Sequence, residues 1–319
     1  MENSSTFKQA GLSYSVILPI FNEEACLDDM LHRINNVLLS LKEPFEIVCI
    51  DDGSSDRSWS IIEKTVEKNP HIKGVKFLRN FGHQLAVYAG IKYCQGEYIA
   101  VMDADGQDPP ELLPELFAKC KMGYDVVNAV RRERKENIFK RMAYKLFYVF
   151  YKAIVPFDVP LDSGDFSVFN KNVAEFIRSL DEKTPFIRGL RSWYGGKQVN
   201  IEYERQKRLA GTPKYSFWKL ILLAANASVS FSKMPLRIIS IAGIGISFVS
   251  FFYGTTMIIM KLTMGIEVLG WTSTAVLIVF FGGLNLFVLG IIGEYIGNIF
   301  DEVKNRPPFS IEKIIGLKL

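Results

Sequence analysis

The sequence has few of the residues that build metal clusters or disulfide frameworks. It contains 4 cysteines and 3 histidines in 319 residues, and no two cysteines form a Cys-x-x-Cys pair. Wide cysteine spacing of this kind argues against a zinc ribbon and against a disulfide-stapled secreted scaffold. We therefore expect Cys26, Cys49, Cys94 and Cys120 to be unreacted thiols in a reducing compartment.

An excess of one charge and a leader-like N-terminus are also missing. The 38 Lys and Arg residues nearly balance the 34 Asp and Glu residues, so the composition gives no reason to expect a nucleic-acid partner. Residues 1–15 contain no apolar run of signal-peptide length, and we expect the first domain to stay in the cytosol. Long hydrophobic runs are confined to the last quarter of the chain.

The first two thirds of the chain alternates short apolar runs with helical stretches. The predicted strands lie near residues 14–20, 45–50, 74–78, 98–101 and 125–130. One helix is predicted over about 25–41, and two more are predicted to end at about residue 68 and at residue 94. This alternation predicts an α/β domain with a parallel sheet and helices on both of its faces. Ligands of such sheets bind outside the carboxyl ends of the strands.

Three of these predicted strand ends are acidic. They carry Asn22-Glu23, Asp51-Asp52 and Asp103-x-Asp105. Two carboxylates one residue apart can turn toward one hard cation such as Mg²⁺ or Mn²⁺. A lone Asp-x-Asp is more often a solvated turn, but three acidic strand ends on one rim favour a binding site.

Segments rich in basic residues come after the acidic strand ends in the sequence, and each of these segments has two interpretations. Arg131 to Arg134 form either a diphosphate clamp or a solvated turn. Residues 139–152 mix cations with aromatic residues, which is typical of a helix in a membrane interface but also of a core helix with one wet face. Residues 205–215 are either a basic functional loop or a linker, and residues 185–196 are predicted to be helical.

Two uncharged stretches, 238–260 and 272–293, follow. Each is long enough to cross a hydrocarbon core of about 30 Å, which needs about 20 helical residues. Lys and Arg flank the pair on its outer sides and are nearly absent from the loop between them, so the positive-inside rule predicts cytoplasmic ends. The alternative is a buried helical hairpin in a soluble protein.

Five motifs occur in a recognisable order. They are VILPIFNEE (16–24), IDDGSSD (50–56), RNFG (79–82), MDADGQDPP (102–110) and SGDF (163–166). In this order they resemble the family-2 glycosyltransferases with the GT-A fold, and most closely the polyisoprenyl-phosphate branch that includes dolichyl-phosphate mannose synthase and the bactoprenol glucosyltransferases. The resemblance covers nearly the whole chain, because the two C-terminal spans match the bactoprenol type as well.

The resemblance implies roles for matching residues. The residues expected to hold the nucleotide and donor are Pro19, Phe21, Glu23, Asp51, Asp52, Asp103, Ala104, Gln107, Arg134 and Arg208. Asp103, Asp105 and Gln107 would hold Mg²⁺ or Mn²⁺. The expected catalytic residues are Asp165 beside the reacting sugar, Asp105, and the phosphate-neutralising Arg131 and Lys214.

The resemblance also implies an organisation. Residues 1–215 would form the cytosolic GT-A domain, a Rossmann-like mostly parallel sheet with an interfacial helix near 139–153. A juxtamembrane amphipathic helix (216–235), a transmembrane hairpin (236–300, with spans at about 238–260 and 272–296) and a cytosolic tail (301–319) would follow. The partners would be a nucleotide sugar, a polyprenyl phosphate and the lipid bilayer of the bacterial inner membrane, with the number of copies left open.

The expected reaction is transfer of one sugar, glucose from UDP-glucose, to undecaprenyl phosphate with inversion. GDP-mannose or a UDP-amino sugar is the alternative donor, and a membrane-anchored nucleotide-binding scaffold is the non-enzymatic alternative. A phosphate acceptor is already largely dianionic at neutral pH, because its second pKa is about 6. Asp165 is therefore expected to position the sugar or a cation more than to remove a proton. The wider family's polymer synthases carry Gln-x-x-Arg-Trp, and Gly189–Trp193 lacks the Gln.

Overall fold

The computed structural model describes residues 11–132, 163–180, 182–204, 234–264 and 270–317. The chain divides into two units. One comprises the residues up to Tyr148, Phe157–Lys214 and the C-terminal residues from Arg306, and the other comprises Val149–Pro156 and Tyr215–Asn305. Each is described by itself.

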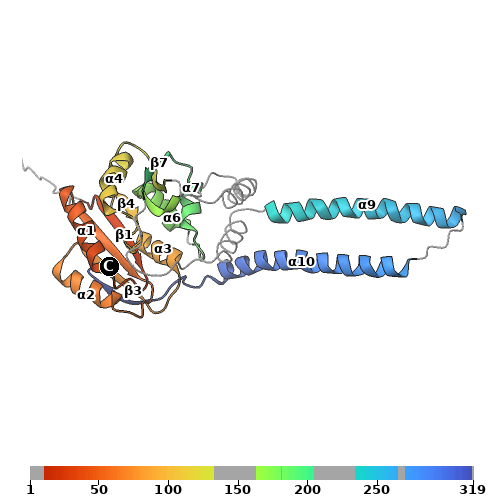
Figure 1. The fold of residues 1–319 in the computed structure, drawn as a ribbon, viewed down its shortest axis with the longest axis horizontal. Helices are drawn as coiled ribbons and strands as arrows, with labels where there is room; N and C mark the ends of the chain where they lie inside the picture. Colours follow the sequence, from red (N-terminus) through yellow and green to blue (C-terminus); the bar gives the residue numbers. More distant parts are fainter. Residues whose placement is uncertain (1–10, 133–162, 181, 205–233, 265–269, 318–319) are drawn as a thin grey trace, which may run out of the picture. The chain divides into compact units, whose positions relative to one another are not determined.

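The first unit is built on one eight-stranded sheet (Figure 1). Its strands are β1 (Tyr14–Ile20), β2 (Phe45–Asp51), β3 (Ile72–Phe77), β4 (Tyr98–Val101), β5 (Val126–Arg131), β6 (Ser163–Asn170), β7 (Gln198–Tyr203) and β8 (Ile311–Ile315). They lie in the order β7-β5-β6-β4-β1-β2-β3-β8. Neighbours pair in parallel except that β6 is antiparallel to β4 and β5, and β8 is antiparallel to β3.

Helices follow most of the strands. They are α1 (Leu27–Ser40), α2 (Ser58–Lys68), α3 (His83–Tyr93), the 3-10 turn η1 (Pro110–Leu112), α4 (Leu113–Lys121), α6 (Lys171–Leu180) and α7 (Ile187–Trp193). Every residue of β1 and of β2 is buried, as expected for parallel strands covered on both faces. The expected α/β class with a mostly parallel sheet is confirmed. All four cysteines are free and buried.

The end of the chain forms a strand that we did not expect. Within the segment expected to be a cytosolic tail, β8 lies in the first unit and pairs along β3. Lys313 Nζ lies 2.7 Å from Glu63 Oε1, and Lys76 Nζ lies 2.9 Å from Glu312 Oε2. Glu312 and Lys313 are exposed in the middle of β8 and Ile311, Ile314 and Ile315 are half-buried, which suits an edge strand, but a run of five residues without strict alternation is too short to predict a partner.

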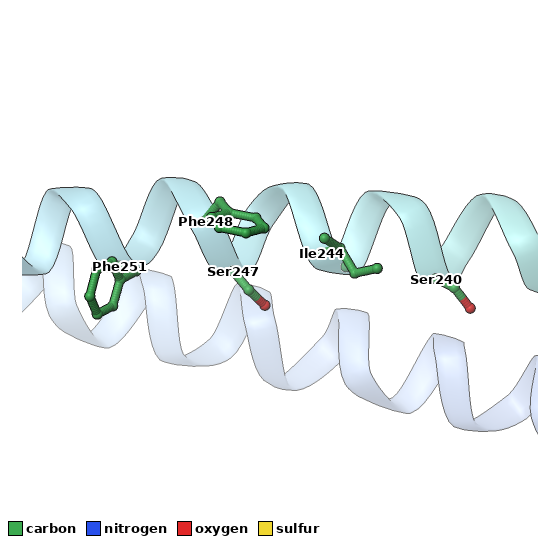
Figure 2. A pocket seen from close by; sticks show the side chains of 6 residues that line it. Ser240, Ile244, Ser247, Phe248 and Phe251 are labelled. Carbon is green, nitrogen blue, oxygen red and sulfur yellow. The ribbon is translucent and has the colours of Figure 1, made fainter.

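The described part of the second unit consists of α9 (Met234–Met264) and α10 (Trp271–Lys304). Two stretches, Leu236–Thr263 and Val276–Lys304, are long and apolar enough to cross a membrane, and none of either is buried. Large exposed side chains such as Phe251, Phe252 and Leu289 run along them, which indicates association with a membrane rather than a place in a soluble core. Residues of α9 between Ser240 and Phe251 line an open pocket of about 730 Å³ (Figure 2).

The sheet also contains a buried ion pair whose loss should lower the stability of the protein. Glu46 is buried on β2, ion-pairs with Lys73 on β3, and accepts hydrogen bonds from Ser15 Oγ and the Gln95 backbone, each at 2.5 Å. Glu46→Ala leaves these donors without their acceptor, so the free energy of unfolding should fall by about 3–5 kcal/mol.

A urea titration of the full chain in detergent measures this loss. Glu175→Ala is the matched control, because its exposed pair with Lys171, at 3.6 Å, should contribute less than about 0.5 kcal/mol. Equal losses in both variants would contradict the assignment of Glu46 as a buried anchor of the sheet.

Candidate active site

The acidic strand ends meet at one edge of the sheet. β1 pairs with β2 so that Ile20 lies opposite Asp51, and β4 lies on the other side of β1 in parallel. Asp51 ends β2 and Asp52 follows it, while Asp103 and Asp105 follow β4. All four therefore lie at the carboxyl ends of the two strands that flank β1. This edge is where a parallel α/β sheet binds its ligands.

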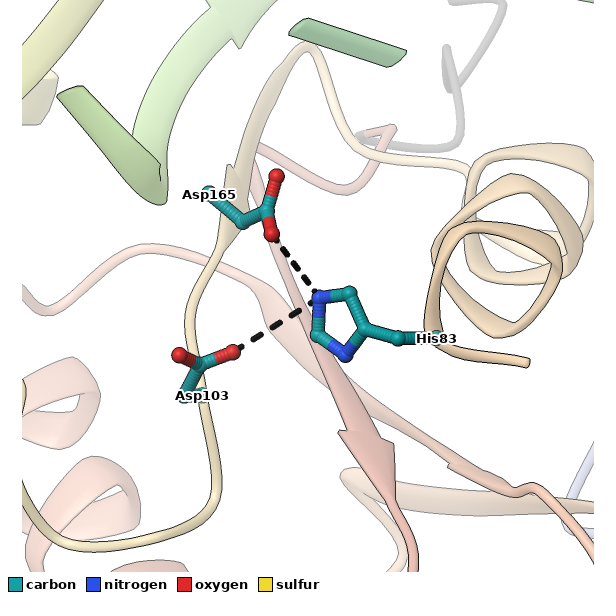
Figure 3. A group of neighbouring side chains, drawn as sticks. All are labelled: His83, Asp103 and Asp165. Atoms are coloured by element: carbon teal, nitrogen blue, oxygen red, sulfur yellow. Dashed lines mark hydrogen bonds and ion pairs between the residues drawn. The ribbon is translucent and has the colours of Figure 1, made fainter. Parts of the chain in front are cut away.

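The centre of the site is a cluster of His83, Asp103 and Asp165 (Figure 3). Both carboxylates face the same imidazole nitrogen: His83 Nε2 lies 2.9 Å from Asp165 Oδ2 and 3.7 Å from Asp103 Oδ1. One ligand atom from each residue lies within 4.8 Å of the others. The three come from the start of α3, the end of β4 and β6, so segments far apart in sequence build the cluster.

Arginines of α7 surround Asp165 from the other side. Arg188 binds the carboxylate with both arms of its guanidinium, from Nε to Oδ1 at 2.7 Å and from Nη2 to Oδ2 at 2.8 Å. Arg191, which is buried, donates from Nη1 to the Asp165 carbonyl at 3.4 Å. Asp165 itself is only 6% exposed. A bidentate charge-assisted pair of this kind fixes both the position and the ionised state of the carboxylate.

The charges shift the pKa values of this cluster. Burial acts to raise the pKa of Asp165, but the charge and hydrogen bonds of Arg188, with those of His83, outweigh it and hold that pKa well below its usual range. Burial acts to lower the pKa of His83, but the hydrogen bond and charge of Asp165 and the charge of Asp103 raise it to about 9. Burial lowers the pKa of Arg191 to about 10. Before a ligand binds, Asp165 is thus an anion between two cations.

Asp52 holds the loop that leads to His83. Its Oδ1 accepts from the Phe81 backbone N–H at 2.7 Å, and its Oδ2 accepts from that of Gly82 at 3.0 Å. At the neighbouring Gly53 a Cβ would lie 2.4 Å from the carbonyl carbon of Arg79, and its φ is +68°. Only glycine permits this approach without strain. The IDDGSSD motif therefore fixes the RNFG loop, and the Asp52 carboxylate is already engaged there.

Asp51 lies one residue earlier and has a different environment. Its side chain is fully buried, and neither oxygen has a partner at hydrogen-bonding distance and angle among the described residues. Burial raises the pKa of Asp51, and the nearby Ser54 and Lys76 offset this only in part. A buried carboxylate whose nearby donor, Ser54, does not reach full hydrogen-bonding geometry is costly, so a ligand that brings N–H or O–H groups would be stabilised here.

The remaining predicted residues fall into two groups. Pro19 and Ala104 are buried, Phe21, Glu23 and Gln107 are half-buried, and Asp105 is buried with Oδ1 accepting from the Gln107 backbone N–H at 3.1 Å. All of these lie at the same strand ends. Arg131 is at the end of β5, where its Nη2 would be 3.1 Å from a Cβ on Gly164. Arg134, Arg208 and Lys214 lie outside the described residues. The same holds for the interfacial helix expected over 139–153 and for the juxtamembrane helix expected over 216–235, except for its last two residues, which begin α9.

Comparison with known proteins shows the family to which the chain belongs. The model of glycosyl transferase family 2 matches residues 15–178. The chain belongs to this family. It is 42% identical to the uncharacterized glycosyltransferase YkcC of Bacillus subtilis (strain 168) over 96% of this chain and 95% of that protein. It is 37% identical to the bactoprenol glucosyl transferase of Shigella phage SfII over 95% and 98%. It is also 31% identical to the undecaprenyl-phosphate 4-deoxy-4-formamido-L-arabinose transferase of Proteus mirabilis (strain HI4320) over 98% and 97%.

Three residues of this glycosyltransferase's site were not assigned roles from the sequence: His83 of the cluster, and Arg188 and Arg191 beside it. His83 follows the RNFG motif directly and opens α3, after Gly82 with φ +105°. A histidine at the start of a helix and next to a motif loop is a signal from which His83 could have been predicted to be a site residue. Arg188 and Arg191 lie at i and i+3 of a short helix, a spacing that puts both on one face, but no local pattern indicates that this face meets Asp165.

The donor set of the cluster fits a divalent cation in part. Carboxylate oxygens suit Mg²⁺ and Mn²⁺, and imidazole suits transition metals. Asp103 belongs both to the set expected from the motif (Asp103, Asp105, Gln107) and to the set seen in space (His83, Asp103, Asp165). Asp165, however, already has a guanidinium across both oxygens. Asp103 is the ligand that both arrangements share.

The two-armed contact of Arg188 gives a testable prediction. Arg188→Lys keeps a positive charge but cannot span both oxygens of Asp165, so kcat of the glycosyltransferase should fall by about tenfold. The matched control is Arg33→Lys, because Arg33 makes the same two-armed contact with Glu111, at 2.9 Å from Nη2, away from the cluster. We expect the control to keep its kcat within about twofold, since an exposed pair contributes little. Equal activities of the two variants would show that the geometry of Arg188 is irrelevant.

Proposed function

We propose that this glycosyltransferase transfers a single glucose from UDP-glucose to the phosphate of a polyprenyl phosphate, with inversion at the sugar carbon. The strongest support for this proposal is that one chain combines an acidic site, two helices of membrane-spanning length and similarity to a named glucosyl transferase. It carries an acidic strand-end rim with a fixed Asp165–Arg188 pair and two helices of membrane-spanning length. It is also similar, over nearly its full length, to a protein named bactoprenol glucosyl transferase.

On the donor side, Asp51 would accept hydrogen bonds from the nucleotide. No described residue donates to its buried oxygens at full hydrogen-bonding geometry, although Ser54 lies nearby, and a base or ribose supplies N–H and O–H groups. Pro19, Phe21 and Glu23 lie at the adjacent end of β1 and would border the same nucleotide. Asp52 would act indirectly, because its carboxylate holds the RNFG loop.

A divalent cation, Mg²⁺ or Mn²⁺, would be held by Asp103 and Asp105 with Gln107. When bound, it neutralises the charge that develops on the nucleotide-diphosphate leaving group. Arg131 at the end of β5, with Arg134, Arg208 and Lys214, would add positive charge toward the phosphates of donor and acceptor.

On the acceptor side, the chemistry needs no base. A phosphate monoester has a second pKa of about 6, so it is a competent nucleophile at neutral pH. Asp165 is held ionised, with a pKa well below its usual range under the influence of Arg188 and His83. Such a carboxylate is a weak proton acceptor. We assign Asp165 the role of orienting the sugar and stabilising positive charge at its reacting carbon.

The course of the chain supports a membrane hairpin with both ends on one side. After β7 the chain runs through α9 and α10 and returns to the first sheet as β8. If both helices span a bilayer, this return requires entry and exit on the same side. Lys233, Arg237, Lys304 and Arg306 flank the pair, so this side would be the cytoplasmic face of the bacterial inner membrane.

A second donor remains a candidate because of one relative. The Proteus mirabilis protein is named for transfer of a 4-deoxy-4-formamido-L-arabinose, so a similar chain is named for an amino-sugar donor. GDP-mannose is the other alternative. A scaffold without activity is the non-enzymatic alternative, and the intact Asp103-x-Asp105 pair argues against it.

The test is transfer of radiolabelled sugar from a panel of nucleotide sugars to undecaprenyl phosphate in detergent, with and without EDTA. We expect EDTA-sensitive lipid-linked product from UDP-glucose and none with Asp103→Ala. Glu111→Ala, which removes a carboxylate after the same acidic turn, is the control and should keep its activity. Product from another donor alone would replace the sugar and keep the reaction. Nucleotide binding without product from any donor would establish the scaffold.

A further inference from the structure

The C-terminal residues contact the strand that leads into the active-site loop. Phe309 stacks on Phe77, with ring centroids 4.9 Å apart and an interplanar angle of 16°. Phe77 is fully buried and meets Phe81 edge-on at 5.7 Å. The Leu78 backbone N–H donates to the Ser310 carbonyl at 3.0 Å. Three aromatic rings thus connect the tail to the RNFG loop.

This loop has contacts on two sides and ends at a residue of the cluster. On one side Asp52 accepts from the backbone N–H groups of Phe81 and Gly82. On the other side the ring of Phe81 contacts Phe77, which Phe309 covers. His83 follows directly and reaches Asp165 at 2.9 Å. Displacement of Phe81 would therefore alter the start of α3 and the position of the imidazole.

The pairing of β3 with β8 places these contacts where the loop begins. The register is regular from Gly74 to Lys76 and shifts between Lys76 and Phe77, so that Phe77 lies opposite Ile311. Such an irregularity re-aims the side chain next to it. The ion pairs Lys313–Glu63 and Lys76–Glu312 hold β8 along the sheet but do not involve the loop. Attachment of the strand and support of the loop are thus carried by different residues.

We propose that Phe309 is a positioning residue: through Phe77 and Phe81 it holds residues 79–82 so that His83 meets Asp165. Phe309 comes five residues after the last residue of α10, Lys304. The segment that leaves the second membrane-length helix therefore supports the active-site loop as well as extending the sheet. The effect on catalysis rests on the proposed transfer reaction, whereas the effect on the loop does not.

The experiment compares Phe309→Ala with Lys313→Ala in the full chain in detergent. Hydrogen exchange of peptides covering residues 78–85 reports on the loop, and the transfer assay reports kcat and KM. Phe309→Ala should raise loop exchange by about tenfold and lower kcat by about tenfold, with KM for the nucleotide sugar within about twofold. Lys313→Ala should change exchange in β8 but leave the loop and kcat at wild-type values. Phe309→Tyr keeps the ring face and should behave like the wild type.

The outcomes separate this inference from the proposed function. Unchanged loop exchange in Phe309→Ala, or the same increase in Lys313→Ala, would overturn the positioning role even if transfer is observed. No transfer by the wild-type protein would refute the reaction, while faster loop exchange in Phe309→Ala would still support the positioning role. If Phe309→Ala does not fold, Phe309→Leu keeps the apolar volume without the flat ring. Loop exchange in that variant should then be raised by about threefold, and an unchanged rate would count against the proposal.

Discussion

Replacing Asp165 by asparagine should lower kcat for sugar transfer by about 10²–10³-fold with little change in nucleotide affinity. The substitution keeps the shape of the side chain and removes the charge that faces Arg188 and His83. If Asp165 stabilises developing positive charge at the sugar, this loss appears in the transition state and therefore in kcat. Single-turnover transfer and equilibrium nucleotide binding measure the two quantities.

The pH profile distinguishes this role from that of a general base. The neighbouring Arg188 and His83 hold the pKa of Asp165 well below its usual range, so this carboxyl stays ionised throughout the neutral region. kcat/KM of the wild type should then rise through the acceptor's second ionisation, near about pH 6, and stay level until His83 begins to lose its proton toward its pKa of about 9. Asp165→Asn should give the same rise near about pH 6 at lower activity, although it also removes the carboxylate that raises the pKa of His83. An additional rise above pH 7 that disappears in the variant would identify a base.

Loss of the fold is the alternative explanation for a low rate, and the structure provides a way to separate the two. Asp165→Asn leaves the Arg188 guanidinium without its carboxylate in a largely buried setting, which is destabilising. The double variant Asp165→Asn with Arg188→Gln removes both charges and should recover most of the thermal stability. Its activity should stay low. Recovery of activity together with stability would show that Asp165 is needed only for folding.

The features that were predicted from the sequence are those that depend on neighbouring residues. Buried apolar runs followed by turns located the strands, because alternation and turn residues are properties of neighbouring positions. The acidic residues after β1, β2 and β4 lie at one edge because parallel pairing brings carboxyl ends together. The helix expected over 185–196 is shorter, since α7 spans Ile187–Trp193 and ends before Gly195, whose φ of +72° does not continue a helix.

What the sequence did not predict depends on contacts between distant positions. His83 meets Asp165 across 82 residues, and Arg188 meets it across 23. The sequence shows that His83 and Arg188 are ionisable residues. Which carboxylate they contact depends on how α3 and α7 are placed around the sheet. β8 is the clearest case, because the exposed edge of β3 that it covers exists only once the sheet has formed.

Removing the divalent cation should abolish transfer, and the residues that hold it can be identified by their effects on binding. Both candidate sets contain Asp103, so Asp103→Ala should lower Mn²⁺ affinity by about 10²-fold and kcat by about 10³-fold. The other members differ: Asp105 and Gln107 come from the motif, whereas His83 and Asp165 come from the spatial cluster. Electron paramagnetic resonance of free Mn²⁺ in the presence of nucleoside diphosphate measures the affinity of each variant.

We expect the motif set to hold the cation. Arg188 contacts both oxygens of Asp165 at 2.7 and 2.8 Å, and its positive charge repels a second cation at the same carboxylate. Asp105→Ala should therefore lower Mn²⁺ affinity by at least about tenfold, and His83→Ala by less than about threefold. Glu111→Ala, a carboxylate bound to Arg33 outside the cluster, should have no effect. A tenfold loss in His83→Ala with wild-type affinity in Asp105→Ala would reverse the assignment, and Asp165 would then have to release Arg188 whenever the cation binds.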